Sequence, residues 1–121
     1  MNPSSDYVAK HRFARISVRK LRPILDLVRG KYADDAMDIL KYLPHRGARM
    51  IEQVLKSAMA NAEDLKEHKP EYNGLKTDRL WVKEAVAGHA TSLKRMIPKA
   101  RGSAGPIIKR NCHVKIVLSD E

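Results

Sequence analysis

The sequence predicts an α+β fold in which three helices pack on a small antiparallel sheet that carries a long extended β-hairpin. Apolar residues recur every three or four positions through residues 48–65, the spacing of a buried helix face. Residues 111–119 alternate in polarity like a half-buried strand, and a long basic segment connects them to β-like residues 79–87. We expect residues 1–121 to form a single domain, with the hairpin at about residues 88–112.

The first expected strand covers residues 7–16, whose basic content indicates an exposed element. Ser17 follows as a helix N-cap whose side chain can accept a hydrogen bond from a free amide of the first turn. Gly30 suits the end of a helix that runs to about Arg29. Pro23 lies beyond the first turn, so the helix either begins later than Ser17 or bends there. The predicted buried stripe consists of Leu21, Ile24, Leu25 and Val28.

Two further helices are expected. Residues 33–42 form a short one, because Asp34 and Asp35 favour a helix N-terminus and Pro44 lies just beyond the other end. The helix through residues 48–65 is the longest, and its small residues allow close approach of a sheet or helix. Residues 66–77 contain proline, asparagine and glycine and are expected to form a loop. In the last strand we expect one face to be buried (Cys112, Val114, Ile116 and Leu118) and the other to be polar (His113, Lys115 and Ser119).

The segment at residues 93–110 carries six positive charges with no acid and no aromatic residue, so it cannot form a core of its own. Two extended arms of about nine residues would reach ~30 Å, with a tight reversal near Ser103 made by the permissive backbone of residues 102–105. Such a ribbon repels itself and needs a polyanion to neutralise it. A disordered basic loop is the alternative. The six cations are Lys94, Arg95, Lys99, Arg101, Lys109 and Arg110.

The net charge of +10 is concentrated at the two ends of the chain. Residues 1–31 carry +6 and residues 93–121 carry +5, whereas residues 32–92 carry −1. This segregation favours a nucleic-acid partner. Arg19, Arg22 and Arg29 fall near one face of the first expected helix, opposite much of its apolar stripe, where they can meet a phosphate backbone. No apolar run is long enough to cross a membrane and no signal sequence is recognisable, so we expect a soluble, non-secreted protein.

An enzyme would need an acid, base, nucleophile or metal set, and none is apparent. The five histidines have no metal-binding spacing, no phosphate-binding glycine loop follows a strand, and the single cysteine, Cys112, is expected to be a core residue in a reducing compartment. We therefore expect no catalytic residue, no metal and no cofactor. An architectural DNA-binding protein remains the alternative to an RNA-binding one, because a basic hairpin also suits a minor groove.

Several runs along the chain resemble the ribosomal protein L-twenty-two family of the bacterial large subunit. The similarity extends over about residues 8–120 and is carried by residues 10–15 (KHRFAR), 17–20 (SVRK), 27–31 (LVRGK), 54–63 (VLKSAMANAE), 93–102 (LKRMIPKARG), 108–110 (IKR) and 113–119 (HVKIVLS). Family members usually carry arginine where this chain has Ser103 and another basic residue where it has Pro106, so the tip is expected to be less charged here.

The resemblance implies a structural protein of the large ribosomal subunit, located in cytoplasmic ribosomes, that binds large-subunit rRNA and supports subunit assembly. It also implies that the hairpin tip lines the exit tunnel, with the nascent peptide and neighbouring ribosomal proteins as further partners. The tip corresponds to Arg101, Gly102, Ser103 and Ala104. The residues expected to contact rRNA are Lys10, Arg12, Arg15, Arg19, Lys20, Arg22, Arg29, Lys31, Lys94, Arg95, Lys99, Arg101, Lys109 and Arg110.

Overall fold

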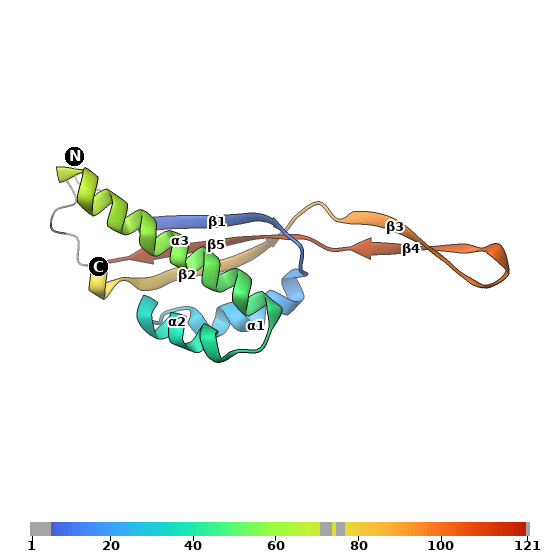
Figure 1. Cartoon of the computed structure of the whole chain (residues 1–121), viewed down its shortest axis with the longest axis horizontal. Helices are drawn as coiled ribbons and strands as arrows, with labels where there is room; N and C mark the ends of the chain where they lie inside the picture. Colours follow the sequence, from blue (N-terminus) through green and yellow to red (C-terminus); the bar gives the residue numbers. More distant parts are fainter. Residues whose placement is uncertain (1–5, 71–73, 75–76, 121) are drawn as a thin grey trace.

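A computed structural model describes residues 6–70, 74 and 77–120 of the chain. Within them, three α-helices and a three-stranded sheet form a body from which a two-stranded ribbon projects (Figure 1). The α+β prediction is confirmed. The elements in chain order are β1 (Asp6–Ala14), α1 (Val18–Val28), α2 (Ala33–Tyr42), α3 (Arg46–His68), the 3₁₀ turn η2 (Thr77–Arg79), β2 (Trp81–His89), β3 (Leu93–Pro98), the 3₁₀ turn η3 (Ala100–Gly102), β4 (Ala104–Lys109) and β5 (Cys112–Ser119).

The body sheet is antiparallel with the strand order β1-β5-β2, and the helices cover one of its faces (Figure 1). The face of β5 toward the helices is fully buried and consists of the predicted residues Cys112, Val114, Ile116 and Leu118. Ser119, predicted to be exposed, is only 1% exposed. It pairs with Asp6 on one side and Trp81 on the other, because β5 is the central strand.

Helix α1 confirms the predicted limits and the buried stripe of Leu21, Ile24, Leu25 and Val28. Ser17 occupies the N-cap position, but its side chain makes no capping bond, so that part of the prediction is wrong. The helix also begins at Val18 and continues through Pro23, which rules out a later start. Gly30 ends it with a φ of +81°, a conformation that glycine adopts without a steric penalty.

Helix α2 has the predicted limits, and α3 is longer than predicted. Residues 66–68, expected in a loop, complete the last turn of α3, whereas residues 71–73 and 75–76 of that expected loop lie outside the described residues. Helix α3 packs on β1 and β5 and buries residues from Gly47 to Ala62. Each fully buried leucine or isoleucine stabilises the fold by about 1.5–3 kcal/mol. The buried residues are Gly47, Ala48, Ile51, Val54, Leu55, Ala58 and Ala62.

The ribbon is a separate sheet formed by β3 and β4, paired from Leu93 with Lys109 to Pro98 with Ala104. It continues the direction of β2 and β5 away from the body (Figure 1). Each arm has six residues of paired strand, which span roughly 20 Å, and residues 90–92 and 110–111 separate this pairing from that of the body sheet. The β2 strand also begins and ends two residues later than predicted, since residues 77–79 form η2. Asn111 bridges the interruption, donating from Nδ2 to the Thr91 carbonyl at 3.0 Å.

Hydrogen exchange on the free protein should separate the body from the ribbon. We expect the amides of residues 94–110 to exchange nearly unprotected and those of residues 51–65 to be strongly protected, because β3 and β4 are mostly exposed and pair only with each other, and an isolated two-stranded ribbon is marginally stable in water. Mass-spectrometric exchange at several time points measures this difference. Slow exchange in the ribbon would show that it is stable without a partner.

Candidate nucleic-acid interface

A basic cleft lies where the ribbon joins the body. It has a volume of about 390 Å³ and is formed by the end of β1, the beginnings of α1 and α3, and the segment after β4. Four cations predicted from the sequence meet here although they lie almost a hundred residues apart in the chain. The charged side chains of this basic cleft are Arg15, Lys20, Arg46, Lys109 and Arg110.

Two helix N-termini add to the positive potential of the basic cleft. Neither α1 nor α3 has an acidic residue in its first turn. Unpaired amides give a helix N-terminus a partial positive charge, which acids normally offset and which anions find favourable. Here Lys20 and Arg46 increase that charge instead. This arrangement can accommodate an anion such as a phosphate group.

Arg46 is not among the residues predicted from the sequence to contact RNA. Its Nη2 donates to the carbonyl oxygen of Arg15 at 2.5 Å, which ties the start of α3 to the end of β1. A guanidinium group has five N–H donors, so this bond leaves others for an anion. The feature of the sequence that could have identified Arg46 is its charge. Arginine is unfavourable at a helix N-terminus that has no acid in its first turn, because the amides there already carry a partial positive charge.

Cations also follow the ribbon away from the basic cleft. Lys94 and Arg95 lie on β3, Lys109 ends β4, and Arg110 follows it; all are exposed. The segment from residue 93 to residue 110 has no acid, so none of these charges is neutralised within the ribbon. The structure thus places the arms of the ribbon in line with the cleft.

The tip of the ribbon is closed by short-range hydrogen bonds. Ser103 donates from its hydroxyl to the Ala100 carbonyl at 2.8 Å, and its own carbonyl accepts from the Lys99 amide at 2.6 Å. Arg101 and Gly102 adopt φ values of +59° and +73°, so the reversal lies slightly before the predicted position. Gly105 was expected to belong to the reversal, but it lies in β4 and pairs with Ile97 of β3.

The remaining predicted cations lie outside the basic cleft, although Arg19 lines a neighbouring hollow at the base of the ribbon together with Arg110. Arg19, Arg22 and Lys31 are exposed along and after α1, and Lys10 and Arg12 are exposed on β1. Arg29 differs from them because its guanidinium donates to Asp26 at 2.6 Å and to the Ala85 carbonyl, which joins α1 to β2. Arg29 therefore has a structural role in the body, and contact with RNA stays a prediction for it.

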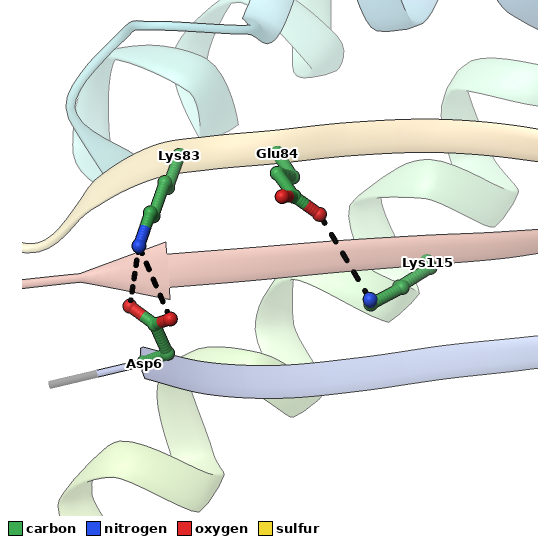
Figure 2. Close-up of polar contacts among 4 residues, drawn as sticks. All are labelled: Asp6, Lys83, Glu84 and Lys115. Atoms are coloured by element: carbon green, nitrogen blue, oxygen red, sulfur yellow. Dashed lines mark hydrogen bonds and ion pairs between the residues drawn. The ribbon is translucent and has the colours of Figure 1, made fainter. Parts of the chain in front are cut away.

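The open face of the body sheet carries two cross-strand ion pairs (Figure 2). Lys83 reaches across β5 to Asp6 at 3.2 Å, and Glu84 contacts Lys115 at 3.8 Å. Exposed pairs of this kind contribute at most about 1 kcal/mol each. Their larger effect is on the charge pattern, since they neutralise the part of the sheet that lies away from the ribbon.

The chemistry of an enzyme finds no support in the described residues. Cys112 is fully buried, and burial raises the pKa of its thiol, so the thiolate needed for nucleophilic attack is disfavoured. Within residues 6–70, 74 and 77–120, no three His, Cys, Asp or Glu side chains group as metal ligands would. No helix in the same part of the chain has the length and apolar character of a membrane span.

Comparisons with known proteins agree with the resemblance seen in the sequence. Residues 9–119 match the family model described as ribosomal protein L22p/L17e. The chain is 43% identical over 118 residues to the large ribosomal subunit protein uL22 of Rhodopirellula baltica, and the match covers 95% of each chain. The residues matched by the family model include every element from α1 to β5 and most of β1. The chain therefore belongs to the ribosomal protein L22p/L17e family and is a structural constituent of the ribosome rather than an enzyme.

Proposed function

We propose that the chain is one rRNA-binding domain, residues 1–121, which holds large-subunit rRNA in the basic cleft and along both arms of the ribbon. The continuity of these two surfaces is the observation that carries the proposal. Five cations and two helix N-termini at the base of the ribbon lead directly into arms that have no acid. Phosphates can neutralise both surfaces at once, and each contact releases counterions.

The ribbon is the part of the chain whose order depends on RNA in this proposal. Its residues are mostly exposed and its like charges repel one another, so a surrounding polyanion supplies what a core would supply elsewhere. Binding early during subunit assembly would order the ribbon within folded rRNA. Its narrow tip, Arg101 to Ala104, would line the exit tunnel and face the nascent peptide, and neighbouring ribosomal proteins would contact the body. Cytoplasmic ribosomes are the proposed location.

The proposed role of the basic cleft is tested by a double substitution, Lys20→Gln with Arg46→Gln. Loss of two phosphate contacts should lower the slope of log Kd against log salt by about 1.5 and weaken binding to large-subunit rRNA about tenfold or more near physiological salt. Filter binding over a range of salt concentrations measures both quantities. Lys41→Gln with Lys56→Gln removes the same charge from exposed positions on α2 and α3 and should change the slope little.

Duplex DNA serves as the competitor in the same assay, because an architectural DNA-binding protein was the alternative. The proposal requires large-subunit rRNA to be bound more tightly than duplex DNA of equal length. It also requires the tagged chain to sediment with large subunits after a high-salt wash. Equal affinity for DNA, together with release from subunits in that wash, would contradict it.

A further inference from the structure

The end of β1 contains an irregularity that aims an aromatic ring at solvent. The pairing of β1 with β5 shifts between His11, opposite Val114, and Ala14, opposite Cys112. Two residues, Arg12 and Phe13, therefore lie in a bulge, and both are exposed where strand alternation would bury one. Phe13 is the only phenylalanine in the chain, yet 53% of it is exposed.

The backbone of Phe13 is strained. Its φ is +58°, in the left-handed region that bulky residues rarely adopt, and among the described non-glycine residues only Arg101 at the ribbon tip shares this conformation. Strain of this kind persists where the surroundings enforce it and is concentrated at functional sites. The strained backbone of Phe13 and the exposure of its apolar ring both lower the stability of the fold. Contact of the ring with a binding partner would explain why this arrangement is present.

His113 of β5 fixes the ring in place. The Phe13 amide donates a hydrogen bond to His113 Nδ1 at 3.0 Å. The two rings meet edge to face, with their centroids 4.7 Å apart and an interplanar angle of 81°. The ring is therefore held in one orientation before any partner arrives, which reduces the entropy lost on binding.

The ring is exposed to solvent and has one cation, Arg12, beside it. Gly88 pairs with His113 on the side away from Phe13, and a Cβ at Gly88 would meet nothing within 4 Å, so the space at Gly88 itself is open. The Arg12 guanidinium lies 5.7 Å from the ring centroid. The acids of the open face, Asp6 and Glu84, are paired with lysines (Figure 2).

We propose that Phe13 is a stacking site for one unpaired nucleobase of RNA, with Arg12 binding a phosphate of the same strand. The proposal rests on the RNA-binding function proposed above and extends it to a base contact outside the basic cleft. A flat ring with an adjacent guanidinium group matches a nucleotide, which combines a π-face with a phosphate. An apolar protein partner would need a contiguous apolar surface, whereas Arg12 directly adjoins the ring. Stacking alone gives little base preference, because every base has a π-face.

Phe13→Ala should weaken binding to large-subunit rRNA by about five- to a hundredfold, the usual range for loss of one stacked base. The slope of log Kd against log salt should stay unchanged, because no charge is removed. Phe13→Tyr keeps the π-face and should bind within about twofold of the natural chain, whereas Phe13→Leu keeps only apolar bulk and should resemble Phe13→Ala. The matched control is Val86→Ala, a truncation at an exposed position of β2 that should leave affinity unchanged.

Fluorescence provides a second measurement that does not depend on affinity. In Phe13→Trp the new indole should be quenched by single-stranded poly(A) but not by a fully paired RNA duplex, whereas the natural chain, whose single Trp81 lies at the other end of β2, should show little change. Equal affinity of Phe13→Leu and Phe13→Tyr, or no quenching of Phe13→Trp, overturns the stacking site. Failure of the natural chain to bind rRNA at all would instead contradict the proposed function, so the two failures are distinguishable.

Discussion

Replacing Lys94, Arg95, Lys109 and Arg110 by glutamine is expected to weaken binding to large-subunit rRNA by a hundredfold or more near physiological salt. Each phosphate contact contributes about 0.7–0.9 to the slope of log Kd against log salt, so loss of four should lower the slope by about 3. All four side chains are exposed, and residues 93–110 contain no acid. Replacing the four cations therefore breaks no ion pair within this segment. Filter binding at a series of salt concentrations gives the slope and the affinity together.

A quadruple control separates position from net charge. Lys41, Lys56, Lys66 and Lys69 are exposed on α2, on α3 or just after it, and glutamine at these positions removes the same total charge. We expect the slope for this control to fall by less than about 1, because these lysines lie outside the proposed interface. Similar slopes for both quadruple variants would mean that net charge alone drives binding and that the arms make no special contacts.

Helix positions were the most predictable part of the fold, because they depend on local spacing. The stripe of Leu21, Leu25 and Val28 has a single arrangement that buries it, and the structure has the predicted helix around it. The last turn of α3 was missed for the same reason. Lys66 and His68 lie beyond the apolar repeat, but the helix continues through them. His68 Nδ1 lies 3.1 Å from the carboxylate of Asp64.

The strand details depended on tertiary context that local patterns do not contain. Ser119 is polar and was assigned to the exposed face, but flanking strands on both sides bury it. The division of the strands into a body sheet and a separate ribbon sheet was also not predictable. At this division Asn111 donates a hydrogen bond to Thr91 on the other arm, a contact between residues 20 positions apart. The strand predicted at residues 7–16 ends at Ala14, and the bulge at Arg12 and Phe13 shifts its pairing just before that end.

Charge identified most of the candidate interface, but not how its parts meet. Lys20 and Lys109 were separate predictions, and only the packing of α1 and α3 at the base of the ribbon brings them to one cleft. Arg46 was missed because residues 32–92 are nearly neutral in total, which hides a single cation placed at a helix N-terminus. Conversely, Arg29 fitted the predicted basic face but is bound to Asp26 and to β2.

Gly47→Ala is expected to destabilise the protein by about 1–2 kcal/mol. An alanine Cβ at this position would lie 2.7 Å from Leu21 Cδ2, with the Cδ1 atoms of Ile16 and Ile24 at 3.2 and 3.3 Å. Overpacking of a tight core costs about 1–3 kcal/mol, whereas alanine improves helix propensity by about 1 kcal/mol. Leu21 is fully buried, so it cannot turn away into solvent and the steric cost should prevail. Thermal unfolding followed by circular dichroism should show a melting temperature lower by several degrees.

The close approach at Gly47 also links stability to the candidate interface. Lys20 precedes Leu21, and Arg46 precedes Gly47. The contact between Leu21 and Gly47 therefore sets the distance between these two cations of the basic cleft, and a methyl group added at Gly47 would push them apart. A double-mutant cycle with Leu21→Val should recover part of the lost stability, because the smaller side chain relieves the clash. Gly88→Ala, where a Cβ meets nothing within 4 Å, is the control and should change stability by less than about 0.5 kcal/mol. Unchanged stability in Gly47→Ala would show that α1 and α3 separate easily, and the basic cleft would then be an adaptable surface that adjusts to its phosphates instead of a preformed one.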